Sequence, residues 1–365
     1  MSTMNIESIE SGQLTKQNNH NKGDADSSSN IVSPSAVKLL LLLVSCTCGS
    51  LGMIGGPLLL RLYFLHGGSG KWLSSWAQMT GFPLLFIPLA ILYTRRDRNI
   101  VFFASRKLLS HAALTGVVQG MGNFMFCFGL SFLPASTVSL LVTTQLIFTS
   151  FISLLWVKQK FTPFSINAVV LIIMGSVLIG LSRSSDRPPG VTNAQYVFGF
   201  FISIAAAAIF GFVIVSTQVA YAKANGQAMT YSIVLQFQAC VAFFAALTCA
   251  VGGLVNQDFA AMHKEAKEFG LGARMYYLVL VSNIVVWQMM FIGRAGIIFC
   301  TSSLFAGVMS AIFSTLSQIA AVIAFHENFT GEKGMALGLT LWGFTSYFYG
   351  SYKKAKKPKP VITHP

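Results

Sequence analysis

Residues 108–157 have the sequence LLSHAALTGVVQGMGNFMFCFGLSFLPASTVSLLVTTQLIFTSFISLLWV, which contains no Lys, Arg, Asp or Glu. A membrane-spanning helix needs about 20 apolar residues, because each residue adds about 1.5 Å to its length. The stretch is therefore long enough for two spans. Phe132-Leu133-Pro134 supplies the break between them, since proline starts a helix better than it continues one.

Eight further segments also lack charged residues, and each is long enough for one span. They are 39–60, 72–94, 161–182, 188–222, 224–257, 275–293, 295–326 and 334–352. A buried helix of a soluble protein is the alternative for any one segment, but it does not explain all of them in succession. The sequence predicts an all-α integral membrane protein with ten transmembrane helices.

The composition agrees with a membrane protein. Hydrophobic residues make up 54% of the 365 residues and charged residues 10%, whereas a soluble domain carries about 25% charged residues. This excludes a cytosolic enzyme, a nucleic-acid-binding module and a disordered chain. The net charge of +14 comes from short basic runs between apolar stretches, so it is better explained by orientation in the lipid bilayer than by nucleic acid.

The two ends of the chain differ from the rest. Residues 1–35 are rich in Ser and Asn and predict a disordered tail, not a signal peptide, because no apolar h-region is present. Residues 353–365 form a basic tail, which either contacts anionic headgroups or simply ends the chain. With both tails cytoplasmic, 17 basic residues fall inside and 8 outside, so we predict that both termini are cytoplasmic.

An internal repeat relates the two halves. Residues 136–140 (STVSL) resemble 300–304 (CTSSL), and 160–162 (KFT) resemble 328–330 (NFT). This relates the fourth span to the ninth, and it divides the chain into repeats at 36–182 and 183–352. Five spans per repeat is an odd number, so the two repeats must have opposite orientations. Such inverted repeats are typical of alternating-access transporters that bind their ligand near the bilayer midplane.

Catalytic and metal-binding patterns are missing. The sequence contains no His-Glu-x-x-His, no Gly-x-Ser-x-Gly and no phosphate-binding glycine loop. All six cysteines fall within apolar spans, where thiols behave as small hydrophobic groups. We expect no enzyme activity, no cofactor and no metal.

Uncharged polar residues dominate the predicted span interiors. Arg294 is assigned to the cytoplasmic edge between the eighth and ninth spans, so organic anions are disfavoured. Amides and indoles suit a neutral, planar heteroaromatic ligand instead. The candidate binding residues are Asn123, Gln145, Trp287, Gln288, Gln318 and Trp76. For each of them helix packing is the alternative, and for Trp76 a place in the interfacial aromatic belt.

Glu327 and its neighbour His326 are the candidates for proton coupling. Glu327 stands at the end of a span whose polar face should line the cavity. A partly buried carboxyl group there can bind and release protons. The alternative is a solvated outer-loop acid paired with Lys333.

The sequence resembles the plant purine permeases of the drug/metabolite transporter superfamily. In the first half the resemblance rests on residues 61–68 (RLYFLHGG), 72–76 (WLSSW), Gln78, 81–83 (GFP), 133–137 (LPAST), 144–149 (TQLIFT) and 157–163 (VKQKFTP). In the second half it rests on 302–309 (SSLFAGVM), 326–327 (HE), 341–344 (LWGF) and 346–350 (SYFYG). The matching residues occur in order over roughly 38–352.

The resemblance implies ten helices and proton-coupled uptake of purine bases and their derivatives, including cytokinins and some alkaloids, often at the plasma membrane. The sequence departs from the family pattern at Val138, where a small hydroxyl residue is expected. It also departs at Ser317-Gln318, where an acidic residue is expected, so the better-placed carboxylate is missing.

Together these features predict a proton-coupled secondary transporter for adenine, cytokinins and similar neutral heterocycles, in the plasma membrane. A transporter or facilitator of other amphipathic metabolites, such as alkaloids or nucleosides, is the alternative, and a membrane-embedded enzyme or receptor is a remote one. The expected partners are the heterocyclic substrate, protons and lipid, with a homodimer left open.

Overall fold

The computed structural model describes residues 34–94, 106–157, 162–181, 188, 190–223, 231–327 and 329–356. The chain separates into two units, residues 1–37 and 38–365. Only the last four residues of the first unit, at the beginning of a helix, are described. The predictions for residues 1–33 and 357–365 therefore concern residues outside the described part, and the following description is of the second unit.

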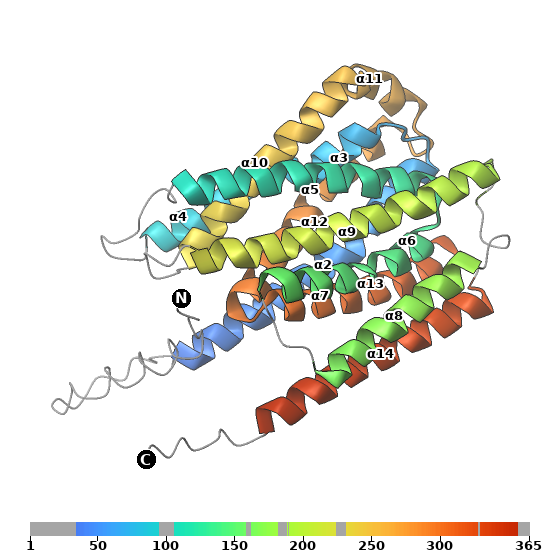
Figure 1. Ribbon diagram of the computed structural model, residues 1–365. Helices are drawn as coiled ribbons and strands as arrows, with labels where there is room; N and C mark the ends of the chain where they lie inside the picture. Colours follow the sequence, from blue (N-terminus) through green and yellow to red (C-terminus); the bar gives the residue numbers. More distant parts are fainter. Residues whose placement is uncertain are drawn as a thin grey trace, which may run out of the picture. The chain divides into compact units, whose positions relative to one another are not determined.

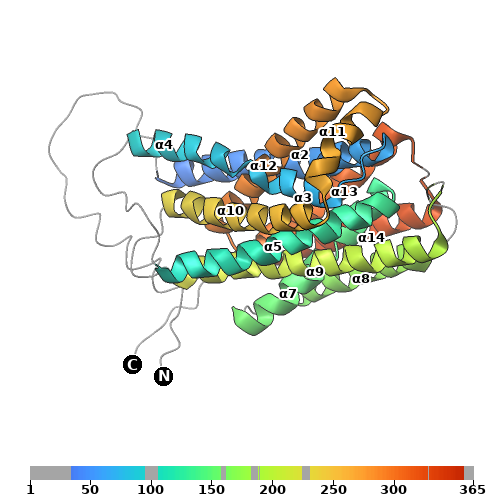
Figure 2. The ribbon, with the colours of Figure 1, turned by 90° about the horizontal axis from the view of Figure 1, so that it is seen from above.

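The described residues form helices and no strands (Figures 1 and 2). In chain order the elements are α2 (Pro34–Leu65), α3 (Lys71–Thr80), the 3-10 turn η1 (Phe82–Leu85), α4 (Phe86–Thr94), α5 (Arg106–Phe132), α6 (Ala135–Val142), α7 (Gln145–Trp156), α8 (Pro163–Leu181), α9 (Asn193–Lys223), α10 (Tyr231–Val255), α11 (Asp258–Glu268), α12 (Ala273–Cys300), α13 (Ser303–Phe325) and α14 (Gly331–Lys356).

Seven stretches of helix among the described residues are long and apolar enough to cross a membrane. They are 37–65, 106–132, 135–156, 193–222, 231–255, 273–300 and 305–325. Helices suit a bilayer because they satisfy their own backbone hydrogen bonds, which lipid cannot do. The other three charge-free segments of the sequence hold α3 with η1 and α4, α8, and α14.

Two of the predicted spans are interrupted. The segment 72–94 is divided by η1, which has Pro83 in its first turn, where proline fits because no backbone N–H is needed. The fourth span is divided between α6 and α7 at Thr143 and Thr144. The break predicted between the third and fourth spans is present, because α5 ends at Phe132 and Pro134 precedes α6.

One boundary predicted from the charges is wrong. Arg294 lies inside α12, which continues to Cys300, and α13 begins at Ser303. A half-buried guanidinium is tolerated when it is hydrogen-bonded, and Arg294 Nη2 donates to Gln119 Oε1 at 3.0 Å. The boundary between these two helices therefore lies at Thr301 and Ser302, and not at Arg294.

Glycines spaced four residues apart, at 52 and 56, 116 and 120, and 334 and 338, can let helix backbones approach closely, and two of these pairs do so. A Cβ on Gly116 would lie 2.5 Å from the Val241 oxygen, and one on Gly52 would lie 2.4 Å from the Met290 nitrogen. Backbones therefore touch between α5 and α10 and between α2 and α12. The pair at 334 and 338 differs, since a Cβ on Gly338 would meet nothing within 4 Å of the described atoms.

Helix α11 packs at one end of the bundle, which we call the α11 end. Asp258 Oδ2 accepts hydrogen bonds from the Trp72 and Leu73 backbone N–H groups, 2.8 and 3.1 Å away, at the start of α3. Glu265 accepts from the Tyr63 hydroxyl at 2.6 Å. Lys71 at the start of α3 lies over the ring of Phe132 at the end of α5, so α6 also begins at this end.

Candidate functional site

A small, largely enclosed cavity, which we call the central cavity, lies between helices of both predicted repeats. Its volume is about 20 Å³, which is room for about one water molecule. Its walls come from seven helices and comprise Met53, Pro57, Gln119, Phe126, Val142, Gln145, Phe210, Trp287, Met290, Arg294 and Ser310. A planar heterocycle is larger than this space, so binding requires the surrounding helices to separate.

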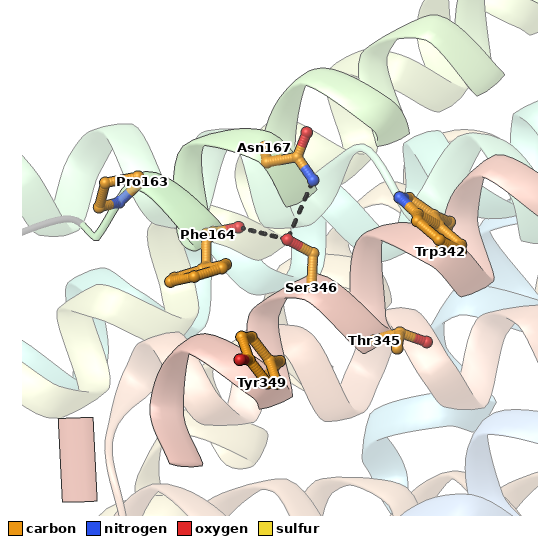
Figure 3. Close-up of a pocket in the computed structure, with 7 residues that line it drawn as sticks. All are labelled: Pro163, Phe164, Asn167, Trp342, Thr345, Ser346 and Tyr349. Carbon is orange, nitrogen blue, oxygen red and sulfur yellow. Dashed lines mark hydrogen bonds between the residues drawn. The ribbon is translucent and has the colours of Figure 1, made fainter. Parts of the chain in front are cut away.

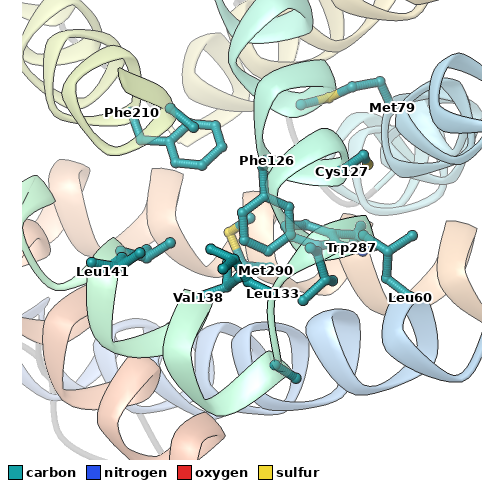
Figure 4. Close-up of a cluster of buried hydrophobic side chains, with 14 of the residues drawn as sticks. Leu60, Met79, Phe126, Cys127, Leu133, Val138, Leu141, Phe210, Trp287 and Met290 are labelled. Atoms are coloured by element: carbon teal, nitrogen blue, oxygen red, sulfur yellow. The ribbon is translucent and has the colours of Figure 1, made fainter. Parts of the chain in front are cut away.

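Aromatic rings form the apolar wall of the central cavity. Figure 4 shows Phe126 between Phe210 and Trp287. Their ring centroids are 6.1 Å apart for Phe126 and Phe210, and 5.6 Å apart for Phe126 and Trp287, where the rings meet edge to face. Flat π-faces at this spacing suit stacking against another aromatic ring. Trp287 was predicted from the sequence, whereas the two phenylalanines were not.

Gln145 lies at the break in the fourth span. The backbone N–H groups of Leu146 and Ile147 bond three residues back to Thr143 and Thr144, at 3.1 and 2.9 Å, so the chain is locally a 3-10 turn. Both threonine hydroxyls bond back to earlier carbonyls, which favours such a bend. A 3-10 stretch within a helix often marks a functional hinge. The turn brings the Gln145 side chain to the cavity wall.

The Trp287 indole ring packs against α2, whereas its N–H group has no hydrogen-bond partner among the described residues. A Cβ on Gly56 would lie 2.7 Å from its Cε2 atom, so only glycine leaves room for the ring against α2. The indole Nε1 is buried and finds no hydrogen-bond acceptor among the described residues. Burying an unpaired donor costs roughly 1–3 kcal/mol. A ligand acceptor would remove that cost.

Arg294, Gln119 and Asn123 form a hydrogen-bonded chain beside the cavity. Arg294 donates to Gln119 Oε1, and Gln119 Nε2 donates to Asn123 Oδ1 at 2.6 Å. The Asn123 Nδ2 donor is left unpaired among the described residues. Asn123 therefore lies one hydrogen bond behind the cavity wall. Gln119 and Arg294 line the cavity itself, although neither was among the residues predicted to bind the substrate.

The other three predicted binding residues do not line the cavity. Gln288 Nε2 donates to the Met79 carbonyl at 3.3 Å, which directs this amide toward α3. Trp76 is half-buried and meets Phe259 edge to face at 5.3 Å. Gln318 is fully buried in α13, with both amide atoms unpaired among the described residues.

The proton-coupling candidates lie at the α11 end. Glu327 Oε1 accepts from the Ala135 N–H at 2.9 Å and Oε2 from the Ser136 N–H at 3.0 Å. The Ser136 hydroxyl also donates to Glu327 Oε2. The carboxylate thus caps the N-terminus of α6, where it opposes the helix dipole. His326 is exposed at the end of α13 with a left-handed backbone, φ 49°.

Lys333 and a series of serines continue from this cap. Lys333 is buried, and its Nζ donates to the Ser136 hydroxyl at 2.7 Å. One turn further along α6, Ser139 donates to Ser317 on α13 at 3.3 Å. Ser314 and Ser310 follow on α13: the Ser314 hydroxyl is buried with no partner among the described residues, and Ser310 is part of the cavity wall.

A larger hollow lies between α8 and α14, away from the central cavity (Figure 3). It measures about 460 Å³ and is open. Its rim includes Trp342 and Tyr349, which are 66% and 56% exposed, and Asn167 hydrogen-bonds Ser346 across it at 2.9 Å. Because its walls are exposed and its Asn167 and Ser346 side chains bond to each other, it has the character of a surface groove, not of a substrate site.

The described residues contain no group of three or more His, Cys, Asp or Glu that could hold a metal ion.

A family model for purine nucleobase transmembrane transport matches residues 40–357. The chain belongs to the purine permease family. It is 40% identical to purine permease 3 of Arabidopsis thaliana over 328 residues, covering 88% of this chain and 93% of that protein. It is 39% identical to purine permease 2 of the same plant, covering 90% and 96%.

The fold has also been seen in a solved protein. A crystal structure described only as a protein matches 84% of this purine permease and 97% of its own chain, with a TM-score of 0.55 and 16% identity. Because it belongs to this family and has several helices that are long and apolar enough to span a membrane, the chain is a multi-pass integral membrane transport protein.

Sequence reasoning missed part of the central cavity for identifiable reasons. Gln119 precedes Asn123 by four residues, so the two share a helix face, and this spacing could have found it. Arg294 was assigned to the cytoplasmic edge between two spans because it is charged. Phe126 and Phe210 are two of 31 phenylalanines, and nothing local separates them from the others.

Proposed function

We propose that this purine permease is a secondary active transporter of purine bases and purine-like neutral heterocycles, including adenine and cytokinins. The observation that carries the proposal is the small central cavity, where aromatic rings lie beside the unpaired Trp287 indole N–H and the Gln145 amide. A purine offers a flat π-system with ring nitrogens around its edge. Stacking and edge hydrogen bonds are therefore the interactions it needs.

The transport cycle follows from the proposed architecture of ten spans in two inverted five-helix repeats. The helices α3 with η1 and α4, α8, and α14 would complete the seven longer ones. The cavity walls combine α2, α5, α6 and α7 from the first repeat with α9, α12 and α13 from the second. Rocking of one repeat against the other would open the cavity to each side in turn.

Within the cavity, we assign stacking to Trp287 and edge recognition to Gln145, with Asn123 positioning Gln119. Gln288, Gln318 and Trp76 would act from behind the wall, by fixing the helices that carry it. The buried, unpaired amide of Gln318 supports such a role, because it gains a partner only if α13 moves or a ligand or water reaches it.

Proton coupling is proposed through Glu327, with His326 at the adjacent surface. The carboxylate shares the Ser136 hydroxyl with Lys333, and the serines at 139, 317, 314 and 310 extend from there to the cavity wall. Protonation of Glu327 would weaken its hold on the start of α6. Binding of a proton to Glu327 would in this way be coupled to movement of the span that carries Gln145.

The plasma membrane is the proposed location, with both termini cytoplasmic. Uptake of labelled adenine would test the function, in cells lacking their own purine transporters and in liposomes containing the purified protein. Saturable uptake that is competed by unlabelled adenine and driven by an inward proton gradient is expected. No adenine uptake by either preparation, with the protein present in the membrane, would overturn the proposal.

A further inference from the structure

The Arg294 side chain places a positive charge in the wall of the central cavity, where a substrate can contact it. Its side chain lines the central cavity and also a second, smaller space of about 10 Å³ toward the C-terminal end of α12. Met53, Met290 and Ser310 line both spaces as well, so they adjoin. The guanidinium therefore lies between the two spaces.

The Arg294 guanidinium has more donors than its protein contacts use. Nη2 donates to Gln119 Oε1, and the Phe291 ring lies 5.1 Å from the guanidinium carbon. No carboxylate of the described residues pairs with it. Arginine carries five N–H donors in a planar fork. The remaining donors are therefore available to a ligand in the adjoining spaces.

Arginine and glutamine recognise different purine edges. A guanidinium fork matches the O6 and N7 acceptors of a 6-oxopurine, whereas the amide of Gln or Asn matches the N6 donor and N7 acceptor of a 6-aminopurine. The cavity contains both groups, the amide of Gln145 on α7 and the guanidinium of Arg294 on α12. Adenine needs only the first group.

We propose that Arg294 is a specificity-determining residue that allows the central cavity to accept 6-oxopurines in addition to 6-aminopurines. The proposal rests on the function proposed above, because it concerns the same cavity. A positive charge within the wall also disfavours cationic ligands. Protonated amines are therefore poor substrates, and the acceptor-rich edge of an oxopurine is a good partner.

The test compares hypoxanthine with adenine, which differ in having an oxo or an amino group at position 6. Uptake of each is measured for the wild-type protein, Arg294→Gln and Arg294→Lys, at matched surface expression. Arg274→Gln is the control, because it removes an exposed guanidinium from the same helix. Arg294→Gln should lower the hypoxanthine-to-adenine ratio about tenfold or more, since bidentate pairs discriminate at this level. Arg294→Lys should also lower the ratio, because lysine lacks the fork.

The wild-type protein provides a second measurement that needs no variant to fold. 7-Deazahypoxanthine lacks the N7 acceptor and should compete with labelled hypoxanthine about tenfold less well than hypoxanthine itself. Equal competition would overturn the proposal, and so would an unchanged ratio in Arg294→Gln or Arg294→Lys. Wild-type uptake of adenine without hypoxanthine would overturn it while leaving purine transport intact. Uptake of neither base would instead overturn the proposed function.

Discussion

Glu327 and Ser136 are 191 residues apart in sequence, and the Glu327 carboxylate accepts hydrogen bonds from both the backbone N–H and the hydroxyl of Ser136. Ser136 belongs to the first turn of α6, so an acid from the second half of the chain caps a helix of the first half. The contact fixes the distance between α13 and the interrupted span that carries Gln145. A change in the charge of Glu327 would act directly on this junction.

Replacing Glu327 with Gln should abolish uphill adenine uptake and its pH dependence while leaving exchange of adenine across the membrane. The amide keeps one acceptor oxygen for the α6 cap but cannot carry a proton. Uptake against a gradient and counterflow in liposomes separate the two properties. A variant that still concentrates adenine, with an unchanged response to pH, would show that Glu327 does not couple the proton.

Asp258→Asn is the matched control for this experiment. Asp258 is also a carboxylate that caps a helix from another part of the chain, since it accepts from the first N–H groups of α3. Among the described residues, no series of serines is found between Asp258 and the cavity like the one beside Glu327. Weakening of the cap should cost both variants up to about 1 kcal/mol of stability, whereas only Glu327→Gln should lose coupling.

Gln145→Ala should weaken adenine affinity up to about tenfold, because a lost hydrogen bond to a neutral ligand costs roughly 0.5–1.5 kcal/mol. Trp287→Ala should weaken it at least as much through lost stacking. Gln288→Ala should have a smaller effect on affinity, since the Gln288 amide is directed to the Met79 carbonyl. Apparent affinity from uptake at matched expression checks all three.

Asn167→Ala is a control outside the cavity, because Asn167 belongs to the open groove between α8 and α14. It should keep wild-type affinity. If Gln145→Ala and Trp287→Ala also keep wild-type affinity, the assignment of the central cavity as the substrate site is wrong.

Much of the architecture can be predicted from the sequence because lipid imposes a simple rule. Backbone groups must be bonded within helices, and charges are costly, so charge-free segments locate the helices. The same rule failed at Arg294, which a local criterion treats as a loop residue. Its hydrogen-bond partner Gln119 comes from α5 and depends on the tertiary structure, whereas Phe291 lies one turn earlier on α12; together they make the charge tolerable inside α12.

The interruption at Thr143 and Thr144 could not be predicted from the usual signals. Neither Pro nor Gly occurs there, and the bend depends on hydroxyls that bond back to the preceding turn. Gln145 was nevertheless a candidate for ligand contact, with helix packing as the alternative, because amides and indoles suit a neutral planar heterocycle. Trp287 followed from the same reasoning, whereas the direction of Gln288 depends on the position of α3.

Gly52→Ala should reduce the amount of folded protein in the membrane. A methyl group there would lie 2.4 Å from the Met290 nitrogen, so α2 and α12 would have to separate, and overpacking of this kind costs roughly 1–3 kcal/mol. Gly338→Ala is the matched control, since a Cβ at 338 meets nothing within 4 Å. Thermal unfolding of both purified variants is the measurement. Equal melting temperatures would contradict the close approach of α2 and α12.

Tyr63→Phe should destabilise the α11 end. The Tyr63 hydroxyl donates to Glu265 at 2.6 Å and accepts from the Gly70 N–H at 3.1 Å, and both it and the carboxylate are buried. Loss of a hydrogen bond to a charged group costs roughly 1.5–3 kcal/mol. Tyr277→Phe is the same substitution at an exposed position and should have little effect. A Tm for Tyr63→Phe equal to that of Tyr277→Phe would exclude this role.

The orientation of the chain leads to a labelling prediction. The helices alternate in direction, so Ala194 at the start of α9 and Ala355 at the end of α14 should face opposite sides of the membrane. In a variant whose six native cysteines have been replaced, a cysteine at 194 should react with a membrane-impermeant reagent in intact cells. One at 355 should react only after permeabilisation. This orientation is expected because basic residues resist translocation, and they are in excess in the loops assigned to the cytoplasm. Labelling at 355 and not at 194 in intact cells would reverse the orientation and place Glu327 on the cytoplasmic side, where an inward proton gradient could not reach it first.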